Sequence, residues 1–279
     1  KWMNNEQLLP LSGRDQYLLD SINDVYNTLS TNGIVDALNA EITRAKLAES
    51  NLQSTIDSET TRASAEENAL KLYSNSAIEV ASHGLKHLSL PDVHDGVGAY
   101  DVAIDKSNLE TMFNKIVKGY AYPYGAFNEE SVSLLKKCNI KYARTVISTY
   151  NFDLPSDFLK LNPTCRHAEK NLMELVDKFL SFEYDRRMTP KLFYLWGHSY
   201  EYNDDDNWDV IEEFGKRIGN RDDIWYATNG EIYDYTEAYN RLEFSSDRKI
   251  VYNPSNIDVY FRYNSELVVV KAGETKFLD

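Results

Sequence analysis

Two histidines, His83 and His87, stand four residues apart directly after a short apolar run at residues 76–83. The run predicts a buried strand whose carboxyl end presents side chains to a cleft, as in α/β folds. On a helical turn, residues four apart share one face, so both imidazoles could bind one Zn²⁺-like ion. The spacing alone is a weak signal, but a close pair at a strand end is less common by chance in a chain with only five histidines. We therefore predict metal binding by these two residues.

A second group follows at residues 120–125, Tyr-Ala-Tyr-Pro-Tyr-Gly. Pro123 and Gly125 favour a tight turn directly after an apolar strand. Backbone N–H groups of such a turn can point into the same cleft and stabilise a negatively charged oxygen. Taken by itself, the segment is better explained as an ordinary strand-to-helix turn.

A third group closes the apolar segment that begins at Leu192, where Gly197 and His198 follow Trp196. A lone histidine at a strand end is more often a structural residue with satisfied hydrogen bonds. Three such groups at strand ends favour a functional histidine over a structural one, because the carboxyl ends of neighbouring parallel strands meet at one edge of a sheet. The three groups therefore predict one shared site.

Alternating helix and strand patterns must position these groups. The pattern implies a mainly parallel sheet or barrel with function at the carboxyl ends of its strands. Residues 245–279 lack this alternation and instead predict three short strands joined by turns that contain Asn and Gly. Helices are predicted at residues 129–138, 169–182, 206–217 and 232–242, and strands at residues 142–146 and 223–228.

Composition narrows the class of protein. The chain carries 44 acidic and 30 basic side chains, a formal charge of −14, which argues against sequence-independent nucleic-acid binding because such binding needs a cationic surface. No apolar run is long enough to predict a membrane span. Two cysteines, Cys138 and Cys165, are too few for a disulfide framework, and Cys165 with His167 is a weak metal signal. All five histidines follow residue 74, which predicts a domain boundary near residues 73–76.

Residues 1–74 are predicted to be a helical, oligomerising segment, since residues 36–70 lack Pro and Gly and consist largely of good helix formers. Steps of four and three residues from Leu38 to Leu70 give a narrow, partly charged seam, which favours packing against copies of itself or a partner. Residues 41–52 and 59–70 repeat at a spacing of 18, five helical turns. The repeat resembles the helical connectors of bacteriophage tail fibres, which are typically trimeric; a helix packed on its own domain is the alternative.

The histidine pair, the Pro-Tyr-Gly turn and the strand ending at His198 together resemble the metal-dependent polysaccharide deacetylases of the NodB-homology, carbohydrate esterase 4 type. The resemblance implies an α/β fold, a distorted (β/α) barrel at residues 75–244, between the helical segment and a β appendage at residues 245–279. It also implies removal of N- or O-acetyl groups from glycans such as peptidoglycan, chitin or xylan. Further similar segments are YARTV at 142–146, LNPTC at 161–165, LFYLWGHSYEY at 192–202 and DDIWYATNGEIYDY at 222–235.

The resemblance also implies a role for each matching residue. His83 and His87 would ligate a divalent metal, with Zn²⁺ the first expectation and other divalent ions as alternatives. The backbone N–H of Tyr124 would help stabilise the oxyanion, and His198 would be the general acid that protonates the leaving group. The ion would polarise the acetyl carbonyl and lower the pKa of its bound water toward about 7. Contacts to the sugar rings are expected from Tyr122, Pro123, Trp196 and Trp225.

Two departures from the family pattern stand out. The strand end with paired aspartates that should supply the third metal ligand and the catalytic base has no counterpart before His83. The arginine usually found two residues before the proline of the turn is Ala121 here. Two imidazoles alone make a poor hydrolytic site.

Three explanations stay open at this point. A segment near residues 70–76 is absent from an otherwise active deacetylase, the domain is a catalytically impaired glycan-binding module of a tail fibre, or a neighbouring subunit completes the barrel. We favour a metal-dependent hydrolase acting on an acetylated polysaccharide or peptidoglycan, with the glycan-binding, receptor-binding module as the alternative. A homotrimer in an extracellular, cell-surface or phage-virion location is the matching expectation.

Overall fold

The computed structural model describes residues 13–31, 33–75, 77–182 and 190–278. The chain divides into two compact units, Lys1–Leu72 and Tyr73–Asp279. None of the helices in the described ranges combines the length and the apolar character needed to cross a membrane.

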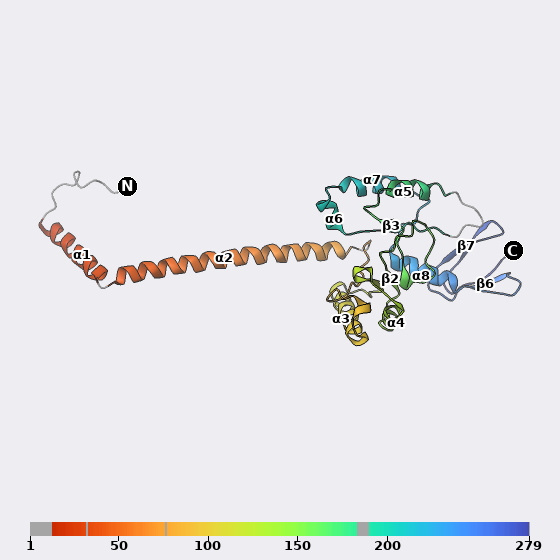
Figure 1. Ribbon diagram of the computed structural model, residues 1–279, viewed down its shortest axis with the longest axis horizontal. Coiled ribbons are helices and arrows are strands. Elements are labelled where there is room, and N and C mark those ends of the chain that lie inside the picture. Colours follow the sequence, from red (N-terminus) through yellow and green to blue (C-terminus); the bar gives the residue numbers. More distant parts are fainter. Residues whose placement is uncertain (1–12, 32, 76, 183–189, 279) are drawn as a thin grey trace. The chain divides into compact units, whose positions relative to one another are not determined.

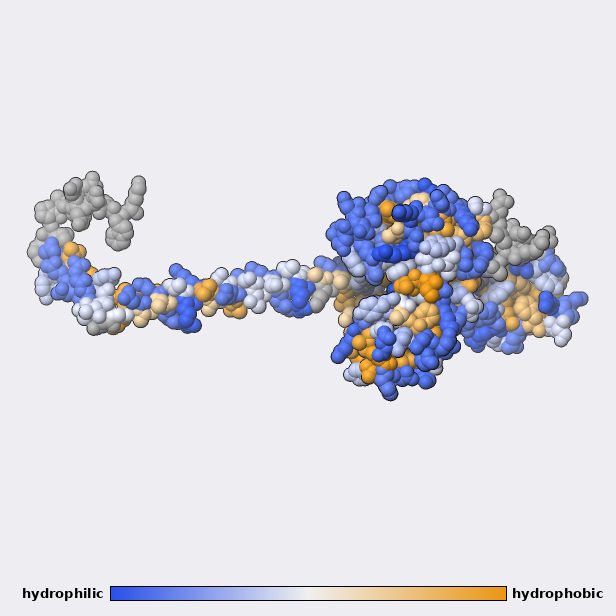
Figure 2. Space-filling model, in the orientation of Figure 1, coloured by the Kyte–Doolittle hydropathy of each residue, from blue (hydrophilic) through white to orange (hydrophobic). Residues whose placement is uncertain are grey.

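The described part of the first unit consists of two helices, α1 (Gly13–Thr31) and α2 (Ile34–Tyr73). Each copy of the 18-residue repeat carries the same exposed ion pair within α2, Arg44 with Glu41 and Arg62 with Glu59. Figure 2 shows apolar patches alternating with polar stretches along α2. Since exposed ion pairs add little stability, burial of the apolar seam is the main stabilisation open to this helix. The exposed apolar side chains on the predicted seam are Leu38, Ile42, Leu52, Ile56 and Leu70.

Short parallel strands organise the second unit. Strand β1 (Gly119–Ala121) pairs in parallel with β2 (Tyr142–Arg144), and β3 (Cys165–Arg166) pairs in parallel with β4 (Leu195–Trp196). Single parallel bridges extend the first pair on both sides, from Ser82 to Tyr120 and from Arg144 to Leu161. The α/β class is as predicted. A closed barrel is not found within the described ranges.

Helices cover these strands in two groups. In Figure 1, α5 and α7 run along one edge of the second unit and α3 lies with α4 at another. Side chains cap several of the helices. His94 accepts a hydrogen bond from the Gly96 N–H at the start of α3, Asn128 accepts one from the Ser131 N–H in α4, and Thr228 accepts one from the Glu231 N–H in α8. The helices are α3 (Asp95–Phe113), α4 (Glu129–Lys137), α5 (Leu172–Leu180), α6 (Ser199–Asp204), α7 (Trp208–Ile218) and α8 (Asn229–Asn240), with short 3₁₀ turns η2 (Leu90–Asp92), η3 (Pro123–Gly125) and η4 (Phe158–Lys160).

Separate apolar clusters hold the strands against these helices. The largest packs β1 and β2 against α3 and α4, with Tyr120, Val102 and Leu135 at its centre. A second cluster buries the inner face of α5, where Leu172 and Val176 surround Cys165. Buried side chains therefore hold the strands against the helices.

In the described residues of the C-terminal appendage, strands joined by turns make up the regular structure, and there are more of them than predicted. A hairpin, β7 (Val259–Tyr263) with β8 (Glu266–Val270), and a three-stranded sheet share a core of Val251, Val270 and Leu278. The sheet is antiparallel in the order β5-β6-β9 and consists of β5 (Glu243–Phe244), β6 (Ile250–Tyr252) and β9 (Thr275–Phe277).

Two predicted strands are wrong. In the apolar run before His83, the described residues 77–82 form a single bridge, at Ser82, and no strand. Residues 223–228 lie outside any strand, because Arg221 pairs with Asp223 and the Tyr226 hydroxyl donates to the Ile218 carbonyl, which folds the segment back on the end of α7. The four predicted helices correspond to α4, α5, α7 and α8, while α3 and α6 were not predicted.

Gly197 should not tolerate a side chain, because a methyl group there would overlap the buried imidazole of His167. We expect Gly197→Ala to lower the free energy of unfolding by about 1–3 kcal/mol, the usual cost of overpacking. Urea unfolding followed by circular dichroism measures the change. Gly215→Ala is the matched control, since the space beside Gly215 in α7 is open and alanine favours a helix. Equal midpoints for the two variants would contradict the tight packing at Gly197.

Candidate functional site

The imidazole of His83 is oriented by the carbonyl of Ala121, which lies 2.7 Å from its Nδ1 atom. A carbonyl oxygen can only accept, so Nδ1 carries the proton and the lone pair of Nε2 is free. This contact follows from the backbone register, in which Ser82 N–H donates to Gly119 O and Ala121 N–H donates to Ser82 O, both at 2.9 Å. The strand pairing therefore sets the tautomer of the ring.

Electrostatics keep His83 in its neutral form. Burial lowers the pKa of His83 most, while the hydrogen bond to Ala121 opposes this and raises it. Electrostatic interactions with His87, Arg144 and His198 lower the pKa of His83 further. His87 is the nearest of these groups, with its ring centroid 4.6 Å from that of His83. Neutral imidazole is the form that binds a metal ion.

His87 meets His83 through a tight loop and not through the predicted helical turn. The two ring centroids are 4.6 Å apart at an interplanar angle of 78°. Gly84 and His87 both have positive φ, 83° and 54°, which ends any helical geometry between the histidines. A side chain at Gly84 would collide with the carboxylate of Asp101. The loop thus needs glycine at this position and still brings the two rings together.

The two rings provide nitrogen donors that suit a divalent ion such as Zn²⁺. The free Nε2 atom and neutral state of His83 fit this role. Within the described ranges, however, there is no group of three or more His, Cys, Asp or Glu side chains placed to hold an ion. Hydrolytic zinc sites use three protein ligands and keep one position open. The pair accordingly fits two positions of such a site.

The Pro-Tyr-Gly turn lies directly beside the histidine pair. Tyr124, with φ 58°, is 73% exposed, and its ring centroid is 4.5 Å from that of His87. Tyr122 differs from expectation, because its ring is buried in the core and its hydroxyl donates to the Leu159 carbonyl at 2.9 Å. Burial leaves no ring face for a sugar, so the predicted substrate contact at Tyr122 is wrong. Pro123 is also buried and shapes the turn.

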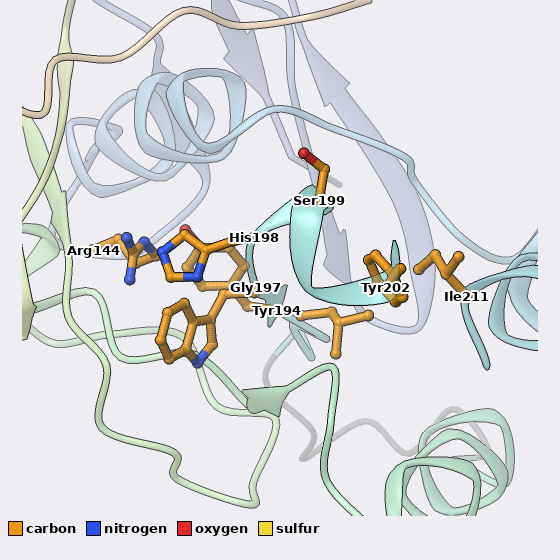
Figure 3. A pocket seen from close by; sticks show the side chains of 9 residues that line it. Arg144, Tyr194, Gly197, His198, Ser199, Tyr202 and Ile211 are labelled. Atoms are coloured by element: carbon orange, nitrogen blue, oxygen red, sulfur yellow. The ribbon is translucent and has the colours of Figure 1, made fainter. Parts of the chain in front are cut away.

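An open pocket of about 470 Å³ carries the third predicted group. Figure 3 shows Arg144 and His198 side by side at one end of this pocket, with Tyr202 and Ile211 at the other. The Arg144 guanidinium lies 4.6 Å from the ring centroid of Trp196, which is a cation–π contact. The Trp196 ring is in turn 5.9 Å from that of His198. Aromatic faces and a cation therefore surround the histidine.

Arg144 was not predicted as a site residue, although it lies within the predicted strand at residues 142–146 and is the last residue of β2. It pairs with Ala121 in the parallel register of β1 and β2. Paired residues of neighbouring strands project to the same face of a sheet. The Arg144 cation thus lies beside Ala121 on the adjacent strand, which is a three-dimensional relation that the order of residues does not reveal.

Glu201 fixes His198 and was also missed. Its Oε1 atom lies 3.1 Å from Nδ1 of His198, and its Oε2 accepts the His198 backbone N–H at 3.1 Å. Arg166 binds the same carboxylate, and Nδ1 of the buried His167 lies 3.5 Å from it. Burial raises the pKa of Glu201, but the hydrogen bonds from His198 and Arg166 outweigh this and lower it to about 2. The three-residue spacing of His198 and Glu201 at a helix start was the available signal.

Trp225 is not brought to this pocket. Its ring is 59% exposed and packs edge-on against Tyr235 at 5.6 Å. The residues that line the pocket include Trp196 but not Trp225. Of the expected aromatic contacts, only Trp196 therefore lies beside His198.

Part of the chain matches a known protein family. Residues 23–143 match the family model described as polysaccharide deacetylase. The match includes His83, His87 and Tyr124 and ends before His198. No curated protein sequence matches the chain.

Solved deacetylase structures resemble only part of the chain. The Streptococcus pyogenes deacetylase PplD, in complex with acetate, is 22% identical over 29% of this chain and 36% of its own length, with a TM-score of 0.28. A polysaccharide deacetylase from Bacillus cereus is 26% identical over 30% of this chain and 27% of its own, with a TM-score of 0.26. The chain therefore spans well under half the length of these proteins.

The ionised carboxylate of Glu201 should make stability depend on pH. Its folded-state pKa, about 2, lies below the ordinary value of 4.5. The stabilisation is therefore complete above pH 4.5 and is lost as the pH falls toward 2. We expect Glu201→Gln to lower the free energy of unfolding by about 2–3 kcal/mol at pH 7, with a smaller difference from wild type below pH 4.5.

Denaturant unfolding between pH 7 and pH 3.5 measures this difference. Glu212→Gln is the control, since Glu212 is exposed and lies 3.9 Å from Lys216. It should show no such pH dependence. A Glu201→Gln difference that stays constant on acidification would contradict the assigned ion pairs.

Proposed function

We propose that residues 75–244 act as a carbohydrate deacetylase, a hydrolase that removes acetyl groups from a glycan. The observation that carries the proposal is the match of residues 23–143 to the polysaccharide deacetylase family model. Support comes from the site itself, where His87 lies in ring contact with both His83 and Tyr124, and Arg144 and His198 line one pocket. The three predicted strand-end groups would then act together.

His83 and His87 would hold a divalent ion, with Zn²⁺ as the first expectation. When bound, such an ion acts as a Lewis acid toward the acetyl carbonyl. The chain's own contribution is to keep His83 neutral with Nε2 free, and to place His87 in edge-on ring contact with both His83 and the exposed Tyr124. The turn at Tyr124 would offer its backbone N–H to the developing oxyanion.

His198 would protonate the leaving group. Its Nδ1 atom lies 3.1 Å from the Glu201 carboxylate, so Nε2 is the ring nitrogen available to substrate. The side chain is 45% exposed. In the overall reaction the hydroxyl group of water joins the acetyl carbon, and the bond from that carbon to the nitrogen or oxygen of the sugar breaks. The proton that water loses replaces the one that His198 donates. The leaving nitrogen or oxygen then receives its proton from His198, which is the general-acid step.

An acetylated glycan suits the surroundings of His198. Tyr200 is 60% exposed and stacks on the His198 ring at 5.2 Å, and Trp196 lies beside the Arg144 guanidinium. Flat rings with polar edges bind the apolar faces of sugars. Acetylated polysaccharide or peptidoglycan is therefore the proposed substrate class.

A glycan-binding module is the second candidate. The specific observation in its favour is that the described residues place only two imidazoles, and no third acidic ligand, around the ion position. The aromatic and cationic lining of the His198 pocket would serve binding equally well. This module would retain glycan affinity in the presence of a chelator and release no acetate.

The N-terminal helices would assemble the protein into a homotrimer at a cell surface or on a phage tail. Support comes from the exposed seam of α2, which includes Leu52 and Ile56. A 40-residue helix with exposed apolar side chains gains stability by packing against equivalent helices. The resemblance of its 18-residue repeat to tail-fibre connectors is the reason for the proposed location.

Acetate release from an N-acetylated chitooligosaccharide tests the enzymatic function. We expect chelator and His83→Ala to abolish release, and His198→Ala to lower kcat about 10²–10⁴-fold, as expected for loss of a general acid. His94→Ala is the control, since His94 caps α3 and should leave activity unchanged. Chelator-independent glycan binding by a wild-type chain that releases no acetate would instead establish the binding module.

Sedimentation velocity tests the trimer. We expect the double substitution Leu52→Asp and Ile56→Asp to convert a three-chain species into monomers, because it introduces charges into the apolar seam. Leu47 is equally exposed on α2 but lies off the seam. Leu47→Asp should therefore stay trimeric. A monomeric wild-type chain would contradict the proposed assembly.

A further inference from the structure

A single carboxylate oxygen on α3 holds the start of the histidine loop. Oδ2 of Asp105 accepts hydrogen bonds from the Ser82 hydroxyl at 2.6 Å and from the backbone N–H groups of His83 and Gly84, both at 3.1 Å. These three donors are consecutive in the chain. Asp105 thereby fixes the backbone at the point where it leaves the bridge between Ser82 and β1 and turns toward His87.

A second carboxylate holds the middle of the same loop. Asp101 is 2% exposed, and its Oδ1 accepts the Lys86 backbone N–H at 2.9 Å. Asp101 and Asp105 are four residues apart in α3, so both project from one face of the helix toward the loop. The missing side chain of Gly84 leaves the space that the Asp101 carboxylate occupies.

The loop depends on these acceptors because its backbone follows no regular structure. With positive φ at Gly84 and His87, the N–H groups of residues 83, 84 and 86 find acceptors in neither a helix nor a strand ladder. Burying such donors without acceptors is unfavourable. Hydrogen bonds to ionised carboxylates are stronger than those to neutral acceptors. The helix α3 therefore determines the shape of the loop.

We infer that Asp105, assisted by Asp101, is a positioning residue for the imidazole pair His83 and His87. Both carboxylates act through the backbone and touch neither imidazole in the contacts described. Strand β1 orients the His83 ring through the Ala121 carbonyl. Helix α3 holds the loop in the shape that places the His87 ring beside that of His83. The inference rests on the proposed metal-dependent function, because its purpose is to preorganise two ion ligands.

Two substitutions of Asp105 can separate the effect of losing its hydrogen bonds from the effect of losing its charge. All three bonds to Asp105 converge on one oxygen, so asparagine can keep an acceptor at that position while losing the negative charge. Alanine removes both. Asp105→Asn should therefore retain much of the loop order that Asp105→Ala loses. Asp95→Ala is the matched control, since Asp95 is an exposed residue in the first turn of the same helix.

Amide hydrogen exchange of the metal-free full chain, measured by NMR, gives the first readout. We expect Asp105→Ala to speed exchange of the His83 and Gly84 amides at least tenfold, with core amides such as Val102 unchanged. Asp101→Ala frees a single donor and should speed exchange at Lys86 alone. This milder variant keeps the inference testable should Asp105→Ala fail to fold.

Calorimetric titration with Zn²⁺ gives the second readout. We expect Asp105→Ala to weaken binding about 10–100-fold, the usual effect of removing a residue that supports metal ligands. Asp105→Asn should weaken it less, and Asp95→Ala should bind as wild type does. Equal Zn²⁺ affinity in wild type and Asp105→Ala would overturn the inference, as would faster exchange spread evenly over the domain. A wild-type chain that binds no Zn²⁺ would instead refute the metal-dependent function from which the inference proceeds.

Discussion

The parallel pairing of Ser82 with β1 is the constraint on which the site depends. Two backbone hydrogen bonds, to Gly119 and from Ala121, place Ser82 in register beside Tyr120. The next residue, His83, then lies where its Nδ1 can reach the Ala121 carbonyl. A shift by one residue would turn His83 to the other face of the sheet. The same β1 is paired with β2, which brings Arg144 beside Ala121.

A carboxylate supports each of the two halves of the site. Asp105 holds the backbone of the histidine loop, and Glu201 holds both the ring and the backbone N–H of His198. Both acids are tied to elements that were not predicted, α3 and α6. In a chain with 44 acidic residues, these two matter because of where they lie. Buried hydrogen bonds to charged acceptors give them a positioning role that exposed acids lack.

The sequence predicts the chemistry of this site better than its shape. The α/β class and the helices α4, α5, α7 and α8 follow from hydrophobic periodicity. The turn between His83 and His87 does not, because a four-residue spacing fits a helix as well as the loop that positive φ at Gly84 creates. Tyr122 was expected at the substrate and is buried instead, since an aromatic residue beside a turn carries no signal of which way it points. Arg144 reaches the site only through strand pairing.

The central claim is that strand register presents His83 as an Nδ1–H imidazole with Nε2 free for an ion shared with His87. Histidine ring ¹⁵N NMR during titration with Zn²⁺ tests it most directly. The account predicts that Nδ1 of His83 keeps its proton throughout. It also predicts that Nε2 of His83 and one ring nitrogen of His87 shift together at one equivalent, while His94 is unaffected. Loss of the Nδ1 proton, or a titration in which neither ring responds, would contradict it.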